Sequence, residues 1–174
     1  DYSKMTISSE DSLYDQMKKI SEWGYNEEMA KVGKPVDKTE WHMSPQTINA
    51  YYSPTSNEIV FPAGILQYPF YDYSRLEMAS NFGAIGSVIG HELTHAFDVS
   101  GAEDDGDGNV KNWWTAEDKA KFDMATKKLE NQFSKYTVGD GVYVNGKYTL
   151  TENIADLGGL NVAYDALQLY LKDH

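Results

Sequence analysis

Apolar residues recur three or four positions apart in four segments of the chain, as they do along one face of a helix. These segments are residues 8–32, 74–98, 115–136 and 151–172. Two of them begin with N-cap signals, because Ser9 and Thr115 each precede acidic residues that the positive end of a helix favours. The pattern predicts a mostly helical chain.

Three segments show strand signals instead. The stretches TINAYY (residues 47–52) and NEIVF (57–61) are rich in β-branched and aromatic residues, and the turn-forming stretch SPTSN joins them. Residues 137–150 are predicted to form another hairpin, with Asn145 and Gly146 at its tip. The expected fold class is therefore α+β, mostly helical with a small β-sheet.

Glycines stand at unusual places within two predicted helices. Gly83, Gly86 and Gly90 are three and four positions apart, which leaves one helix face bare and able to press against another backbone. Gly158 and Gly159 form a pair within the last helix, and a pair inside a helix weakens it unless close packing requires the glycines. Both patterns predict tight helix packing.

Composition and charge narrow the classes of partner. The 174 residues are 41% hydrophobic and 13% aromatic, which is typical of a globular protein with a core. A formal net charge of -12 argues against nucleic acid and anionic membrane surfaces as partners. No apolar run reaches the roughly 20 residues that a membrane-spanning helix needs. The absence of cysteine excludes disulfides, cysteine-ligated metals and a thiol nucleophile, and favours a bacterial protein, cytosolic or exported.

The candidate chemistry lies in the stretch IGHELTHAFD, where His91, Glu92 and His95 match the pattern H-E-x-x-H. Residues four apart on a helix stand one turn above each other, so both imidazoles can reach one metal ion. Glu92 is rotated by about 100° around the helix axis and can instead reach a water molecule beside that ion. The alternative is a pair of core histidines with a hydrogen-bonded glutamate. The apolar, glycine-spaced surroundings favour the metal site.

A catalytic zinc site needs a third protein ligand. Glu152 and Asp156 are four apart at the beginning of the last helix, so Glu152 can ligate while Asp156 accepts the ring N–H of a ligating histidine. Asp98 is a second candidate for this orienting role. The alternative for Glu152 is a helix N-terminal charge favoured by the helix dipole. The other histidines, His42 and His174, lie in no comparable context.

A calcium site is a separate hypothesis for the acidic stretch EDDGDGN that begins at Glu103. Asp105, Asp107 and Gly108 fill positions 3, 5 and 6 of an EF-hand loop, but Trp114 stands at position 12, where a bidentate glutamate is required. An acidic surface loop is therefore the favoured interpretation.

Four motifs in this order resemble the neprilysin-like zinc metallopeptidases, which include neprilysin, the endothelin-converting enzymes and the bacterial oligopeptidase O group. The motifs are NAYYSPTSNEIVFPAGILQYPFY, GAIGSVIGHELTHAFD, NWWT and TLTENIADLGGL. The resemblance runs from about residue 5 to the C-terminus. It implies that residues 1–174 form a single partial catalytic domain with a thermolysin-like zincin fold.

The resemblance also implies roles for individual residues. One Zn²⁺ per chain would be held by His91, His95 and Glu152, with Glu92 as the general base and Asp156 as the partner of a ligating histidine. The expected reaction is hydrolysis of peptide bonds in oligopeptides, on the amino side of hydrophobic residues.

Asn49 and Ala50 match the segment with which the family clamps its substrate. An exposed edge strand fits this role, because its backbone N–H and C=O groups and the Asn49 amide can hold an extended peptide. Without the resemblance, Asn49 would be interpreted as an ordinary residue at the end of a strand. The expected partners are therefore peptide substrates.

Members of the family are several times longer than this chain. They carry a helical N-terminal portion that closes over the site, and a C-terminal segment with a histidine that stabilises the transition state and an arginine that binds substrate. The chain begins at Asp1 and ends at His174 within a helical pattern, so we expect a fragment whose further partner is the remainder of the parent peptidase. The alternative function is a zinc-binding, catalytically weak fragment that binds peptide without efficient turnover.

Overall fold

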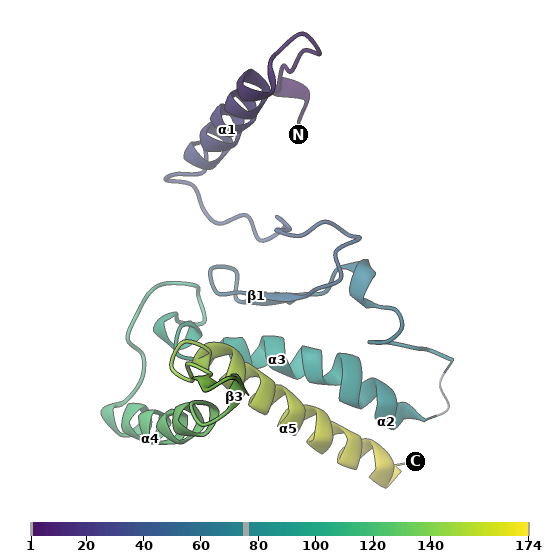
Figure 1. Ribbon diagram of the computed structural model, residues 1–174, viewed down its shortest axis with the longest axis vertical. Helices are drawn as coiled ribbons and strands as arrows, with labels where there is room; N and C mark the ends of the chain where they lie inside the picture. The colour runs from purple at the N-terminus through teal and green to yellow at the C-terminus, as the bar shows by residue number, and fades with distance from the viewer. Residues whose placement is uncertain (1, 75–76, 174) are drawn as a thin grey trace. The chain divides into compact units, whose positions relative to one another are not determined.

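The computed structural model describes residues 2–74 and 77–173, which form helices and two small two-stranded sheets (Figure 1). The elements in chain order are η1 (Tyr2–Lys4), α1 (Leu13–Met29), β1 (Tyr51–Ser53), β2 (Glu58–Val60), η2 (Ala63–Ile65), α2 (Met78–Asn81), η3 (Phe82–Gly86), α3 (Ser87–His95), η4 (Gly101–Glu103), α4 (Ala116–Phe133), β3 (Thr137–Gly139), β4 (Val142–Tyr143) and α5 (Leu150–Asp173). The predicted α+β class with mostly helical content agrees with this order.

The chain divides into two compact units, Asp1–Lys38 and Thr39–His174, which are described separately. That residues 1–174 form a single partial catalytic domain stays a prediction. The first unit is built around α1, which begins after the N-cap Ser12 rather than near Ser9 as predicted. The reason is local: Asp11 accepts a hydrogen bond from the backbone N–H of Ser8 at 2.9 Å, which closes a turn before the helix.

In the second unit, the helix predicted over residues 74–98 is shorter and divided. Residues 75–76 lie outside the described part of the chain, regular helix begins at Met78, and η3 is a π-helical turn between α2 and α3. The helix ends at His95, after which the N–H of Phe97 donates to the carbonyl of Thr94. Asp98 therefore lies in the turn that follows the helix, not within it.

The two strands β1 and β2 pair antiparallel with Tyr52 opposite Ile59, and each is three residues long. The predicted first strand, residues 47–52, is too long because the N–H of Thr47 donates to the carbonyl three residues earlier and forms a turn. Asn49 and Ala50 therefore immediately precede β1.

The hairpin after α4 turns at Asp140 and Gly141, not at Asn145 and Gly146 as predicted. Asp140 and Gly141 have φ values of 48° and 76°, the left-handed conformations that a type I′ turn requires. Asn145 instead accepts a hydrogen bond from the N–H of Tyr148 at 3.0 Å, just before α5 begins. The other helix predictions in this unit agree with the structure, since α4 has Thr115 as its N-cap and α5 covers residues 150–173.

The most extensive contact between elements is that of α3 with α5, which lie side by side (Figure 1). A Cβ atom added at Gly90 would lie 2.7 Å from the carbonyl oxygen of Gly159, and one added at Gly158 would lie 2.3 Å from Oγ1 of Thr94. These distances are shorter than van der Waals contact. The glycine pair therefore lets the two helix backbones meet, as its place in the sequence predicted.

The earlier glycines of this helical segment pack less closely. A Cβ atom at Gly86 would be in ordinary contact with Cβ of Ala163 at 3.7 Å, and one at Gly83 would meet nothing within 4 Å. The prediction of a bare, closely packed face is thus confirmed at Gly90 and wrong at Gly83.

Substituting Gly159→Ala is expected to lower the free energy of unfolding by about 1–3 kcal/mol, because the new methyl group would lie 2.5 Å from the carbonyl oxygen of Ser87 and must separate the helices. Urea denaturation of the chain measures this loss. Gly83→Ala is the control, since its methyl group enters open space and alanine is the better helix former. Equal stability of the two variants would contradict the packing argument.

Candidate metal centre

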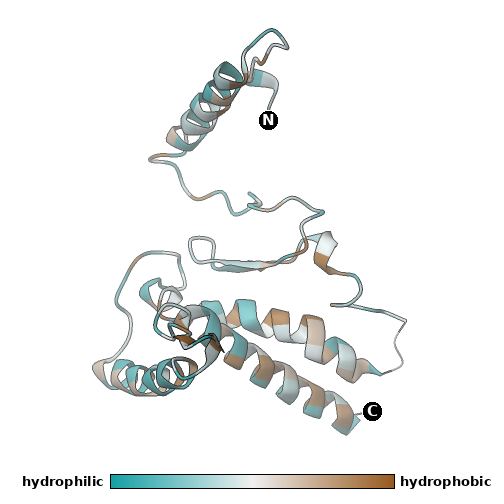
Figure 2. Cartoon of the chain, viewed as in Figure 1, coloured by the Kyte–Doolittle hydropathy of each residue, from teal (hydrophilic) through white to brown (hydrophobic). Residues whose placement is uncertain are grey.

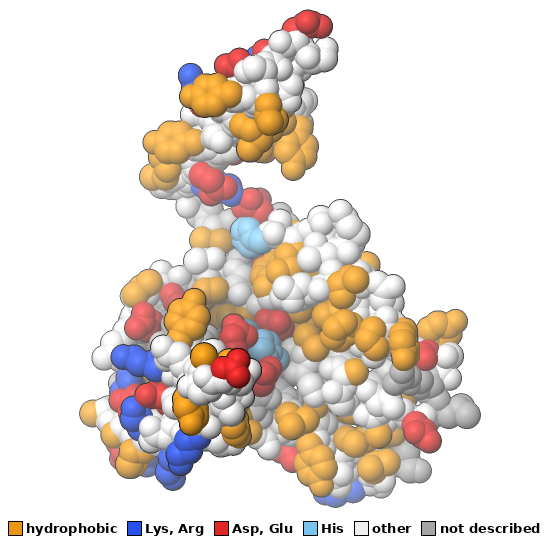
Figure 3. All heavy atoms as spheres, in the orientation of Figure 1, with side chains coloured by type: hydrophobic (Ala, Val, Ile, Leu, Met, Phe, Trp, Pro, Cys, Tyr) orange, Lys and Arg blue, Asp and Glu red, His pale blue; other side chains and the backbone are white. Residues whose placement is uncertain are grey.

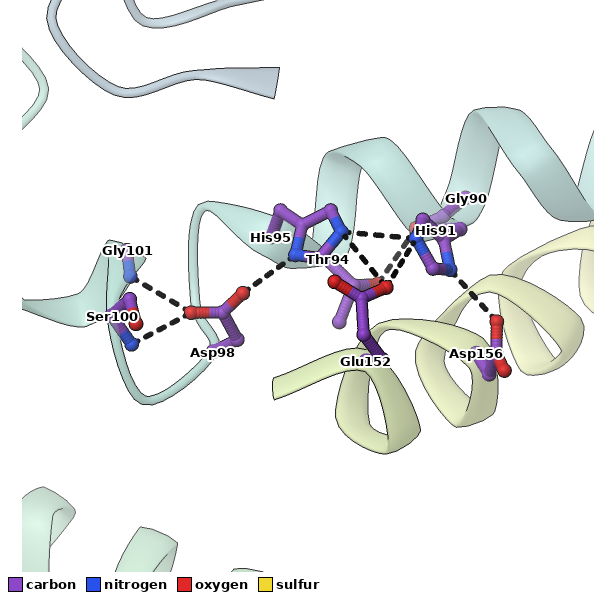
Figure 4. A network of polar contacts seen from close by, with 9 residues as sticks. All are labelled: Gly90, His91, Thr94, His95, Asp98, Ser100, Gly101, Glu152 and Asp156. Carbon is purple, nitrogen blue, oxygen red and sulfur yellow. Dashed lines mark hydrogen bonds and ion pairs between the residues drawn. The ribbon is translucent and has the colours of Figure 1, made fainter. Parts of the chain in front are cut away.

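Helices α3 and α5 bring three potential metal ligands together (Figure 4). His91 and His95 stand one turn apart on α3, with their Nε2 atoms 2.9 Å from each other. Glu152, in the first turn of α5, places Oε2 3.4 Å from Nε2 of His91 and 3.8 Å from Nε2 of His95. Within residues 2–74 and 77–173, this trio is the group of ligand atoms close enough to share one metal ion.

A carboxylate orients each histidine from behind. Nδ1 of His91 lies 2.8 Å from Oδ1 of Asp156, and Nδ1 of His95 lies 2.6 Å from Oδ2 of Asp98. An ionised carboxylate can only accept, so each Nδ1 is the donor. In the neutral ring, Nε2 then carries the lone pair, and both lone pairs point toward the common centre.

The chemistry of this donor set fits zinc. The two Nε2 atoms and the carboxylate of Glu152 approach one another within 2.9–3.8 Å, close enough for all three to bind one cation. Two histidines and one glutamate are a common ligand set of catalytic zinc, and they leave one position for water. The partners of both Nδ1 atoms are the carboxylates that such histidines usually have.

Asp98 is held rigidly in the turn after α3. It is 2% exposed, and its Oδ1 accepts from the N–H groups of Ser100 at 2.7 Å and Gly101 at 2.8 Å. The hydrogen bond to Asp98 raises the pKa of the His95 imidazole above its ordinary value, and burial opposes this effect. A Cβ atom at Gly101 would collide with the carbonyl of His95, so a glycine is needed for the turn to close.

Glu92 lies beside the trio but does not belong to it. Its residue is 5% exposed, and its carboxylate accepts a hydrogen bond from the backbone N–H of Tyr52. Burial raises the pKa of the Glu92 carboxyl; Glu152 acts in the same direction, while the two histidines and the Tyr52 N–H oppose it. A carboxyl group with a raised pKa is better matched to exchanging protons near neutral pH.

An open cleft of about 410 Å³ contains the trio and Glu92. Figure 3 shows acidic and histidine side chains meeting on one face of the molecule. Asn49 and Ala50 line the same cleft, with Ala50 buried and Asn49 exposed. The backbone N–H of Tyr52, two residues after Ala50, reaches Glu92 from the same segment. Asp156 stands behind His91, outside the lining.

Sequence reasoning missed Tyr52, whose backbone N–H reaches Glu92. The available signal was its position two residues after Ala50 in a predicted strand. Of the two histidines set aside, His42 packs its ring against Tyr51 at a centroid distance of 5.8 Å, and His174 lies outside the described residues. Among the described residues, His42 is not part of the group that could bind the metal.

The acidic loop that begins at Glu103 is stabilised by its own hydrogen bonds. Oδ1 of Asp105 accepts from the N–H groups of Asp107 and Asn109, each at 3.0 Å, and Oδ2 lies 3.6 Å from Nζ of Lys111. Because the backbone and a lysine already occupy both oxygens of Asp105, these contacts favour the surface-loop interpretation over a calcium site.

Comparisons with known proteins assign the family. A family model described as Peptidase family M13 matches residues 49–174. The chain belongs to peptidase family M13. It is 49% identical over 157 residues to the endothelin-converting enzyme homolog of Locusta migratoria, covering 90% of this chain and 21% of that protein. It is also 45% identical to neprilysin-11 of Caenorhabditis elegans, covering 99% of this chain and 20% of that protein. The neprilysin-like resemblance is thus confirmed.

Two solved M13-like structures resemble the fold closely. The zinc metalloprotease Zmp1 of Mycobacterium tuberculosis, in complex with an inhibitor, matches with a TM-score of 0.91 and 48% identity over 100% of this chain and 27% of that chain. PepO of Lactobacillus rhamnosis matches with a TM-score of 0.85 and 40% identity over 95% of this chain and 26% of that chain. The chain spans about a fifth of the length of its curated relatives. Since these proteins come from animals and bacteria, a bacterial origin stays a prediction.

Asp156→Asn is expected to weaken zinc binding about 10- to 100-fold. The reason is that the neutral amide replaces the charged carboxylate that accepts from Nδ1 of His91 and fixes the ring. Competition with a chelator measures the change. Asp165→Asn, an exposed position on the same helix, is the control and should bind zinc like the wild type. Equal affinities of the two variants would show that Asp156 does not support the metal site.

Proposed function

We propose that this M13 chain forms the zinc-binding core of a metalloendopeptidase with a thermolysin-like catalytic fold, which hydrolyses peptide bonds in oligopeptides. The observation that carries this proposal is the convergence of His91, His95 and Glu152 beside the buried Glu92 in a single cleft. The similarity to a zinc metalloprotease over the whole chain supports it.

In this proposal His91, His95 and Glu152 hold one Zn²⁺. Zinc at such a site supplies Lewis acidity, which lowers the pKa of a water molecule and polarises a carbonyl group. Glu92 accepts a proton from the attacking water and then transfers it to the leaving amine. Asp156 keeps the His91 ring in the orientation that directs Nε2 to the metal, and Asp98 does the same for His95.

The peptide substrate is proposed to lie along the segment that precedes β1. Asn49 contributes its side-chain amide and Ala50 its backbone N–H and C=O groups, as edge strands do when they bind extended peptides. Tyr51, Tyr52 and Pro54 also line the cleft. The proposed preference is cleavage on the amino side of hydrophobic residues, and it rests on the family resemblance.

A second candidate is a zinc-binding but catalytically weak chain that binds peptide without efficient turnover. One observation favours it for these 174 residues alone: among the described residues that line the cleft, none is lysine or arginine, and the histidines are the two proposed ligands. A transition-state oxyanion therefore finds no other cationic donor there, and losing one donor costs about 100- to 1,000-fold in rate. Efficient turnover is accordingly assigned to the parent peptidase.

The remainder of the parent peptidase is the proposed partner of α5. Apolar residues lie all around this helix (Figure 2), a pattern that is typical of helices buried on every side. Several of them are exposed in this chain, namely Leu157, Leu160, Tyr164, Leu169 and Leu171.

In the part of the chain that the structure describes, no helix has the combined length and apolarity for crossing a bilayer. A bacterial cytoplasmic or exported location stays a prediction.

Measurements of zinc content and of turnover should distinguish the proposed roles of Glu152 and Glu92. Glu152→Gln is expected to lose most of the zinc because it removes an anionic ligand. Glu92→Gln is expected to keep one zinc per chain but to lose about 100-fold or more in peptide hydrolysis, because the general base is gone. Elemental analysis of the purified variants, with peptide cleavage measured in the parent peptidase, gives both quantities.

The wild-type chain and Glu10→Gln, an exposed residue of the first unit, serve as controls. Zinc retained in Glu152→Gln would show that the third ligand is wrongly assigned. Normal hydrolysis by Glu92→Gln would remove Glu92 from the mechanism.

Substrate preference is tested with paired peptides that differ only in the residue after the cleaved bond. The parent peptidase is expected to cleave the peptide with Phe at this position and to leave the peptide with Asp essentially uncut, because an apolar site penalises a buried charge. Mass spectrometry of the products locates the cleaved bond. Equal rates for both peptides would contradict the proposed preference.

A further inference from the structure

Asn57, in the turn between β1 and β2, joins this hairpin to the acidic loop after α3. Its Nδ2 donates to the carbonyl oxygen of Gly106 at 3.1 Å, and its Oδ1 accepts from the phenol of Tyr52 at 3.1 Å. The φ value of Asn57 is 50°, a left-handed conformation that asparagine tolerates better than most residues. The Asn57 side chain thus connects the strand residue Tyr52 to a loop residue, Gly106, that lies 49 positions after Asn57 in the sequence.

The backbones of the hairpin turn and the acidic loop also meet at a second point (Figure 1). Gly108 has a φ of 80°, and a Cβ atom there would lie 2.2 Å from the carbonyl oxygen of Thr55. The hydrogen bonds that Asp105 accepts from within the loop keep it compact, so that it presents Gly106 and Gly108 to the turn. The acidic stretch therefore acts as a preformed support for the hairpin.

The acidic loop and the β1–β2 hairpin are each connected to a different part of the candidate site. The segment that carries the acidic loop follows Asp98, which holds Nδ1 of His95. On the hairpin side, Tyr52 donates its phenol to Asn57 and its backbone N–H to Glu92. The segment before β1 is thereby fixed relative to both the metal ligands and the buried glutamate.

We propose that Asn57 is a positioning residue for peptide binding: by holding the β1–β2 hairpin on the acidic loop, it sets the distance between the peptide-binding segment at Asn49 and Ala50 and the metal centre. This inference rests on the proposed peptidase function. Asn57 acts through Tyr52 and the backbone, not by touching the substrate.

The test uses the full-length peptidase that contains this chain and an oligopeptide with Phe after the cleaved bond. Asn57→Gly keeps the left-handed turn accessible and removes only the amide side chain. It is expected to raise KM about three- to tenfold, the range of one lost hydrogen bond, with kcat within about twofold of the wild type and zinc content unchanged. Asp140→Gly is the matched control, because Asp140 has a φ of 48° in the exposed hairpin after α4.

A second variant tests the connection through the phenol. Tyr52→Phe removes the donor to Asn57 and should also raise KM, but it should have no further effect when combined with Asn57→Gly, because both changes break the same contact. A KM for Asn57→Gly equal to that of Asp140→Gly overturns the inference. So does a parallel loss of kcat and zinc, which indicates general destabilisation. A wild-type peptidase that neither holds zinc nor cleaves the peptide overturns the proposed function first.

Discussion

The candidate site depends on the close approach of two helix backbones. Side chains of fixed length must bring Glu152 to within 3.4 Å of His91, and they can do so only if α3 and α5 lie nearly in contact. The space at Gly158 and Gly159 makes this possible, because any side chain at either position would overlap atoms of the opposite helix. The glycine pair also explains why the ligands are on different helices. Helix α3 supplies two candidate ligands a turn apart, and α5 supplies the third candidate from its first turn.

Four carboxyl groups surround the two histidines, and their environments assign them different roles. Asp98 is buried and held by backbone N–H groups, which fits an orienting residue. Asp156 orients the other ring from the exposed face of α5. Glu152 has a side chain that is 65% exposed and lines the open cleft, where a metal ion from solvent can reach a candidate ligand. Glu92 is buried with a raised pKa, as suits a residue that accepts and returns a proton.

The parts of the site that follow local rules could be predicted from the sequence. The helical spacing of His91 and His95 places both rings on one face, and the spacing of Glu152 and Asp156 does the same on the partner helix. The remaining features depend on contacts between segments that are distant in the sequence, which local rules do not predict. Both Asp140-Gly141 and Asn145-Gly146 satisfy the rule for a hairpin tip, and packing of Gly146 against the end of α4 decides between them. The contact of Asn57 with Gly106 has no periodic signal at all, since it joins two irregular segments.

In the proposed zinc site, metal binding and the contact of α3 with α5 depend on each other. When neither a metal ion nor a proton lies between them, the carboxylate of Glu152 and the two imidazole lone pairs repel one another, which opposes the approach of α3 and α5. A bound Zn²⁺ reverses the sign of this interaction and adds its binding free energy to the folded state. The glycines remove the steric barrier but supply little attraction of their own. In the proposed zinc-bound state, the small residues permit the contact of α3 with α5 and the three candidate ligands hold it closed, so that the candidate ligands contribute to stability as well as to chemistry.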